Sequence, residues 1–189
     1  MTNLFALLEE SPRPWLDPGA LKEKYHRLTS QQHPDVAGAT ADFSVINQAY
    51  QTLSDPAARL RHLLDLESPN PLPRTQSVPE DIAIFFTPVA ETCQSAEAFF
   101  NKHAATTSPL AKALLAPQQY KLHETLDQTI SILQEKQAAL LSQVTEADAL
   151  WQTDRPAALL LLPTLWQSLG YTAKWLTTLR EFLFKLASL

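Results

Sequence analysis

Apolar residues recur at intervals of three and four along most of this chain, which is the spacing of one buried face of an α-helix. Leu21, Tyr25 and Leu28 follow this spacing in a segment over residues 18–32. The next segment, over residues 41–53, has an inward face made by Phe43, Ile46, Ala49, Tyr50 and Leu53. We therefore predict two amphipathic helices that are joined by a short connection and form an antiparallel hairpin.

Aspartate–proline pairs indicate where two of the predicted helices begin. Asp17 precedes Pro18, and Asp55 precedes Pro56. A carboxylate at the N-cap accepts free backbone amides, and proline fits the first helical position because no donor is needed there. We expect a short first helix over residues 3–9 and a fourth helix after Pro56, whose inward face is made by Leu60, Leu63, Leu64 and Leu66.

The second half of the chain is also helical in pattern. A phenylalanine-rich segment begins at Pro79, and Pro88 either kinks it or starts a new helix with Thr87 as its cap. Another helix is expected from Pro109 onward, with a kink at Pro117. Two long seams of apolar residues follow, over residues 126–151 and 162–186. They predict an antiparallel pair, with the phenylalanine-rich segment as a third member.

Residues 68–78 separate the two halves, because three prolines in six residues (Ser68 to Pro73) favour a stiff spacer that is not helical. We predict an all-α chain with an N-terminal domain over residues 1–67, a proline-rich linker over 68–78 and a C-terminal helical bundle over 79–189. Only three glycines are present, which disfavours a fold rich in β-hairpins.

Composition excludes several classes of function. Twenty acidic residues against 15 Lys and Arg disfavour a nucleic-acid partner. The single cysteine, Cys93, allows no internal disulfide and fits a cytoplasmic location. No signal peptide or membrane-spanning segment is expected. No spacing of histidines, cysteines or carboxylates indicates a metal site, a cofactor or an enzyme active site, and the adjacent acids Glu80 and Asp81 suit a helix start.

His33, Pro34 and Asp35 fall in the connection between the two hairpin helices. The second helix of the hairpin contains Asn47-Gln48-Ala49-Tyr50 and is followed by Asp55-Pro56. Together these features resemble a J-domain, the module with which J-proteins stimulate a DnaK-type ATPase chaperone. A short motif needs such a structural context before it carries weight.

The resemblance implies a chaperone-binding surface made by His33, Pro34 and Asp35 together with the basic face of the preceding helix. That face carries Lys22, Lys24, His26 and Arg27. The alternative is that these cations form an ordinary solvated helix face. Gln32 and Val36 flank the motif where the family often has an aromatic and a basic residue, and Glu23 dilutes the basic face, so electrostatic steering is expected to be weaker or more selective.

The overall arrangement resembles the HscB family, in which a J-domain precedes a three-helix bundle that binds the iron–sulfur cluster scaffold IscU. The resemblance assigns scaffold contacts to Phe85, Phe86, Val89, Glu97 and Tyr171. Ala90 and Cys93 stand where acids are expected, and Pro88 interrupts what should be continuous helix. The alternative is that Phe85 and Phe86 lie in the core, while Cys93 is read as a small buried hydrophobe.

These patterns lead to one main hypothesis: a co-chaperone that stimulates ATP hydrolysis by a DnaK/HscA-type chaperone and delivers IscU. It needs no cofactor, contacts neither nucleic acid nor membrane and is not an enzyme. Two alternatives stay open, namely a J-domain co-chaperone with another client, and an interaction scaffold whose J-domain is degenerate.

Overall fold

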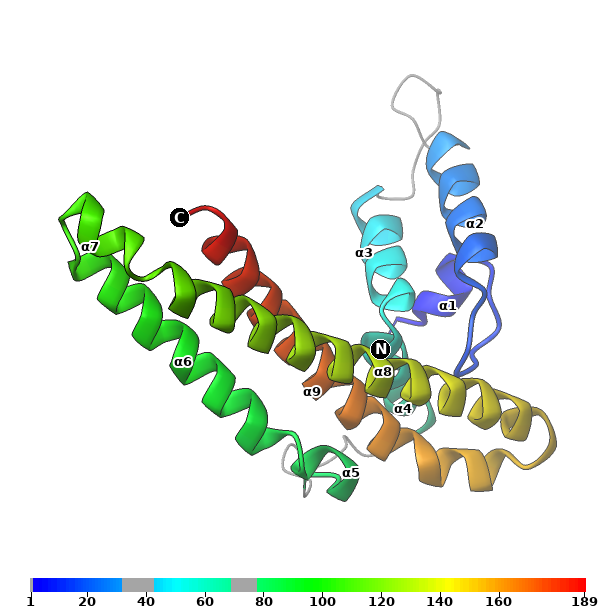
Figure 1. The fold of residues 1–189 in the computed structure, drawn as a ribbon. Coiled ribbons are helices and arrows are strands. Elements are labelled where there is room, and N and C mark those ends of the chain that lie inside the picture. The colour runs from blue at the N-terminus through cyan, green and yellow to red at the C-terminus, as the bar shows by residue number, and fades with distance from the viewer. Residues whose placement is uncertain (1, 32–42, 69–77) are drawn as a thin grey trace. The chain divides into compact units, whose positions relative to one another are not determined.

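The computed structural model describes residues 2–31, 43–68 and 78–189, and every regular element among them is an α-helix (Figure 1). No helix in these ranges is both long enough and apolar enough to span a membrane. The all-α prediction is confirmed. The helices are α1 (Leu4–Leu7), α2 (Pro18–Gln31), α3 (Phe43–Ser54), α4 (Pro56–Glu67), α5 (Glu80–Ala83), α6 (Phe86–Ala105), α7 (Pro109–Ala113), α8 (Ala116–Thr153) and α9 (Arg155–Ala187).

Packing divides the chain into two compact units. The first contains residues 1–77 and 140–169, and the second contains residues 78–139 and 170–189. The long helices α8 and α9 therefore contribute residues to both units. These packing units do not coincide with the predicted division into residues 1–67, 68–78 and 79–189. That division concerns function and stays a prediction.

In the first unit, α2 and α3 pack against each other as the predicted hairpin. Leu21 on α2 and the α3 residues Ile46, Ala49 and Leu53 are buried. Phe43 was also expected to face inward, but it is 54% exposed. Phe43 has the spacing of the buried stripe but is the first residue of α3, so periodicity alone does not bury it.

Buried polar contacts join the N-terminal segment to α8 within the first unit. Asp148 is buried, receives hydrogen bonds from the Arg13 side chain and accepts the backbone N–H of Trp15 at 3.1 Å. The indole of Trp151 donates to the Pro12 carbonyl at 3.1 Å. Because buried polar groups need partners, these contacts fix residues 12–15 against α8.

Arg59 on α4 is buried in the same unit, and burial lowers its pKa to about 10. Its guanidinium donates to the carbonyls of Pro14, at 2.8 Å, and Leu53, at 2.6 Å. These hydrogen bonds satisfy the buried guanidinium and connect the segment before α2 to the end of α3.

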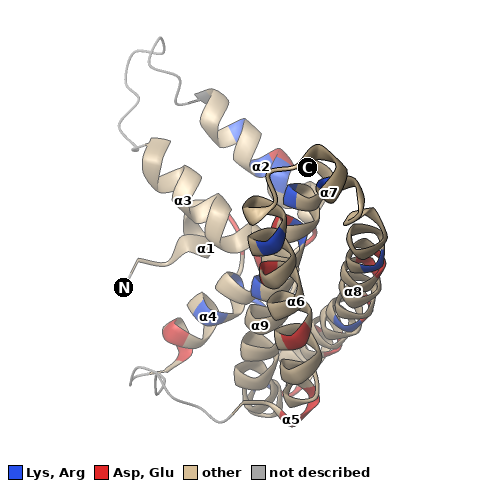
Figure 2. Ribbon diagram, turned by 60° about the vertical axis from the view of Figure 1, so that its left-hand side comes forward, with Lys and Arg blue, Asp and Glu red and all other residues tan. Residues whose placement is uncertain are grey.

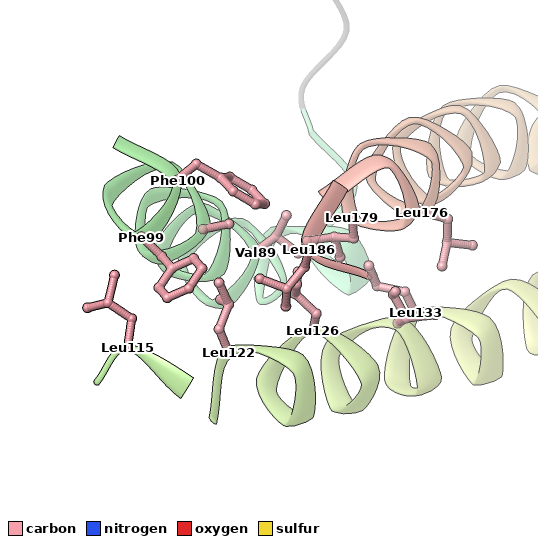
Figure 3. Packing of buried hydrophobic residues seen from close by; sticks show 12 residues of the cluster. Val89, Phe99, Phe100, Leu115, Leu122, Leu126, Leu133, Leu176, Leu179 and Leu186 are labelled. Carbon is pink, nitrogen blue, oxygen red and sulfur yellow. The ribbon is translucent and has the colours of Figure 1, made fainter. Parts of the chain in front are cut away.

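In the second unit, apolar residues of α6, α8 and α9 form one core (Figure 3). Gln119, near the start of α8, donates to the carbonyl of Leu186, near the end of α9, at 3.1 Å. The two helices are therefore antiparallel, as predicted. The core residues are Val89, Ala96, Phe99, Phe100, Leu115, Leu122, Leu126, Ile130, Leu133, Leu176, Leu179 and Leu186.

Several of the described prolines lie in the first turn of a helix, whereas Pro163 lies inside α9. The predicted caps of α2 and α4 are confirmed, since Asp17 accepts the N–H of Ala20 at 2.7 Å and Asp55 that of Ala58 at 2.6 Å. Pro88 lies in the first turn of α6, although Phe85 rather than Thr87 is its N-cap. The kink expected at Pro117 is wrong: α8 starts at Ala116, and a proline in the first turn displaces no hydrogen bond.

Candidate functional sites

The first candidate site is the solvent-facing side of α2. Lys22 and His26 are exposed there, as the sequence predicted. Figure 2 shows the Lys and Arg positions of α2 in blue. His33, Pro34 and Asp35 lie outside the described residues, so their part of the site stays a prediction.

Tyr25 holds α2 against α3 and so fixes the direction of its solvent-facing side. Its ring stacks on that of Tyr50 with the centroids 4.2 Å apart, and its hydroxyl donates to Asn47 Oδ1 at 3.3 Å. Asn47 and Tyr50 belong to the run that carried the J-domain resemblance. Their physical role is therefore to fix the orientation of α2 and of the cations on it.

The other two predicted cations of α2 have partners within the chain. Lys24 Nζ lies 2.8 Å from a carboxylate oxygen of Glu10 and donates to the backbone carbonyl of Glu9 at 3.0 Å. Arg27 forms an ion pair with the Glu9 carboxylate. Sequence reasoning missed both acids. The available signal was two adjacent carboxylates directly after the first helix, but nothing in the sequence shows that this segment returns to α2.

The second candidate site is a cluster of aromatic rings where α6 begins. The ring of Phe86 meets Tyr171 edge-on, with centroids 5.3 Å apart, and Trp175 edge-on at 4.9 Å. Tyr171 and Trp175 are themselves 5.7 Å apart. Phe86 is 39% exposed, while Tyr171 and Trp175 are half-buried. We call Phe86, Tyr171 and Trp175 the aromatic patch.

The other predicted scaffold contacts occupy different environments. Phe85 is half-buried and packs against the core, whereas Glu97 is exposed. Val89 is only 4% exposed and belongs to the core, which differs from the surface position expected for a contact residue. The reason is the register of α6, in which Val89 falls on the buried stripe with Ala96.

Trp175 is the member of the aromatic patch that sequence reasoning missed. It follows Tyr171 by four residues, and residues at this spacing lie next to each other on a helix surface. The spacing was therefore a usable signal. What the sequence could not supply was the approach of Phe86 from α6.

The single cysteine, Cys93, lies on α6. Burial raises the pKa of the half-buried Cys93 thiol, and the nearby Glu97 carboxylate adds to the shift, so the thiol form is favoured. Within the described ranges, no three histidine, cysteine, aspartate or glutamate side chains are grouped so that they could hold a metal ion.

Residues 10–62 match the DnaJ domain family. Over 49 residues, 24% of this chain, the sequence is 51% identical to the chaperone protein DnaJ of Acaryochloris marina, a match that spans only 13% of that relative. Over 52 residues, 27% of this chain, it is 40% identical to the mitochondrial J-type co-chaperone JAC1 of Saccharomyces cerevisiae, of which the match covers 28%.

Solved structures resemble the chain over its whole length. The chaperone HscB of Vibrio cholerae matches with a TM-score of 0.60 and 20% identity, over 98% of this chain and 99% of that one. The human co-chaperone HscB matches with a TM-score of 0.59 and 17% identity, over 100% of this chain and 84% of that one. Residues 10–62 are therefore a DnaJ domain, and the chain as a whole has the fold of HscB.

Proposed function

We propose that this protein is a J-type co-chaperone that binds a DnaK/HscA-type chaperone and stimulates its hydrolysis of ATP. The DnaJ domain over residues 10–62 is the observation that carries the proposal, because it encloses both α2 and the His33-Pro34-Asp35 motif. The protein itself supplies no catalytic group. It acts by changing the state of its partner.

The proposed mechanism follows from the two parts of the site. Lys22 projects from α2 and attracts an acidic surface of the chaperone, which speeds and orients the encounter, and the exposed His26 lies on the same helix to contact that surface. His33 and Asp35 then make polar contacts that are available only in the arrangement competent for hydrolysis. Binding shifts the chaperone toward hydrolysis only through contacts that differ between its two states.

Single-turnover ATP hydrolysis by a purified DnaK-type chaperone from the same organism tests this function. We expect the wild-type protein to raise the rate constant, and His33→Gln to abolish the increase while circular dichroism shows an unchanged fold. If the wild-type protein binds the chaperone but leaves the rate constant unaltered, the proposal fails. The alternative of an interaction scaffold with a degenerate J-domain then holds, and the engagement of Lys24 and Arg27 within the chain favours it.

We further propose that the aromatic patch binds the client, and that the client is the iron–sulfur cluster scaffold IscU. The HscB fold over nearly the whole chain supports this, as does the partial exposure of Phe86 beside Tyr171. Exposed aromatic rings in contact with one another are typical of binding hot spots. A cytoplasmic location, with a single cysteine kept reduced, is part of the same proposal.

Capture of purified IscU on immobilised protein tests the client. Phe86→Ser is expected to weaken capture at least tenfold, because it removes the central ring of the patch. Ile132→Ser is the matched control, since Ile132 is an exposed apolar residue of α8 outside the patch. No capture of IscU by the wild-type protein, with ATPase stimulation intact, would indicate a J-domain co-chaperone with a different client.

A further inference from the structure

Two acids after α1 occupy half of the basic face on α2. Arg27 pairs with Glu9, and Lys24 pairs with Glu10 while its ammonium also donates to the Glu9 carbonyl. The contacts join residues 14 to 18 positions apart in the sequence, so they are made by the fold and not by neighbouring turns of one helix. We call Glu9 and Glu10 the acidic clamp.

The backbone of Glu9 is a second, independent sign that this arrangement is specific. Its φ of 53° lies in the left-handed region, and the N–H of Glu10 donates to the carbonyl of Phe5 at 2.9 Å. Such a hydrogen bond closes a helix C-terminus, where the left-handed position favours glycine. Here a glutamate takes the position, and its carboxylate reaches Arg27. Departures from local preference are typical of functional positions.

The two pairs differ in how easily they open. The side chains of Arg27 and Glu9 are 52% and 56% exposed, whereas those of Lys24 and Glu10 are 31% and 16% exposed. Water screens an exposed pair, so it is worth at most about a factor of five in an equilibrium. A partner with several carboxylates can therefore displace Glu9 from Arg27, but at a cost to its affinity. Ala20, Glu23, Lys24 and Arg27 border an open hollow on α2, which gives such a partner access.

We propose that the acidic clamp is an internal competitor for the chaperone: Glu9 and Glu10 occupy Lys24 and Arg27, and an acidic surface of the chaperone must displace them. The clamp lowers the affinity of the J-domain for acidic surfaces in general. It thereby restricts productive binding to a partner whose carboxylates are placed to replace those of Glu9 and Glu10. This inference rests on the proposed co-chaperone function and adds residues that set its selectivity.

The test is a double-mutant cycle on the concentration of this protein that half-maximally stimulates single-turnover ATP hydrolysis by the cognate DnaK-type chaperone. Glu9→Gly removes the carboxylate and suits the left-handed backbone, so this variant is expected to fold. At about 0.05 M salt, where surface charges are weakly screened, we expect it to lower the half-maximal concentration about threefold to fivefold. At about 0.5 M salt the difference should shrink below twofold.

Arg27→Ala completes the cycle. In the wild-type background it should change the half-maximal concentration less than twofold, because Glu9 already occupies the guanidinium. In the Glu9→Gly background the same substitution should raise it about fivefold. Glu67→Gln is the matched control, because it also removes one negative charge but releases Arg155 on α9 and not Arg27. The effects of Glu67→Gln and Arg27→Ala on the half-maximal concentration should therefore be additive in free energy.

Equal effects of Arg27→Ala in the two backgrounds would overturn the clamp, as would weaker stimulation by Glu9→Gly. The second result would mean that Glu9 orients Arg27 for the partner rather than competing for it. Failure of the proposed function looks different: the wild-type protein would then not stimulate hydrolysis at any concentration, and both proposals would be abandoned together.

Discussion

His62 shows how one residue couples an N-terminal helix to the rest of its unit. Its ring is buried, its Nε2 accepts the backbone N–H of Leu4 at 3.0 Å, and it stacks on Phe5 with centroids 5.7 Å apart. Accepting this hydrogen bond requires the neutral imidazole. Burial lowers the pKa of His62, and the Asp65 carboxylate offsets only part of that shift.

We predict that His62 makes the protein less stable in mild acid. Its pKa is lower in the folded than in the unfolded chain, so the unfolded state binds the proton first as the pH falls below about 6.5. The stability that His62 contributes is complete above that pH and is lost as the pH falls through its folded pKa. Urea denaturation at pH 7.5 and pH 5.5 should show the decrease, and His62→Gln should reduce it. An equal decrease in both proteins would assign it to other groups.

At the residue scale, the sequence predicted what depends on identity and spacing. Lys22 and His26 are exposed as expected, since charged residues opposite an apolar stripe face water. It could not predict that Lys24 and Arg27 meet Glu9 and Glu10, nor that Trp175 joins Phe86. Each of these contacts depends on how distant segments approach each other, which no local pattern records.

At the element scale, helix starts were the most predictable feature, because a cap acts through the few residues beside it. Asp17 and Asp55 accept backbone amides three residues on, as the sequence indicated. Proline was harder to interpret. Pro117 lies in the first turn of α8 and does not bend a longer helix, because α7 ends at Ala113 and α8 begins at Ala116. The break was not predicted, because no glycine and no capping residue marks it in the sequence.

We predict that Asp17→Ala destabilises the protein by about 1 kcal/mol, the usual cost of losing an N-cap. The Ala20 N–H would lose its partner, and α2 would fray at its N-terminal end. Chemical denaturation measures the loss, and Asp17→Asn, which keeps the accepting oxygen, should recover most of it. A full loss in Asp17→Asn would show that the charge matters rather than the cap.

At the scale of the whole molecule, the helical class and the family resemblance were predictable, because amphipathic periodicity and the tripeptide context are local. The grouping of residues 140–169 with the N-terminal segment was not. Hydrogen bonds of Asp148 and Trp151 join this range to residues more than 130 positions away, and hydrophobic periodicity does not predict such polar contacts.

We predict that Asp148→Ala destabilises the first unit by about 2 kcal/mol. The substitution removes the buried acceptor of the Arg13 guanidinium and of the Trp15 N–H. Hydrogen bonds that involve a charged group contribute about 1.5 to 3 kcal/mol, and water replaces part of the loss because the Arg13 side chain is 37% exposed. Equilibrium denaturation should show the loss, and limited proteolysis should show faster cleavage near residues 10–17. Glu146→Ala, at an exposed position of α8 two residues before Asp148, should change stability by less than about 0.5 kcal/mol.

The central claim is that one chain carries two separate binding surfaces, one for a nucleotide-driven chaperone and one for its client. The most direct test applies two assays to the same two variants: single-turnover ATP hydrolysis by the chaperone and capture of purified IscU. The account predicts that His33→Gln no longer stimulates ATP hydrolysis by the chaperone but still captures IscU. Phe86→Ser should still stimulate ATP hydrolysis when IscU is absent but should no longer capture IscU. Loss of both activities in either folded variant, or retention of both, would contradict it.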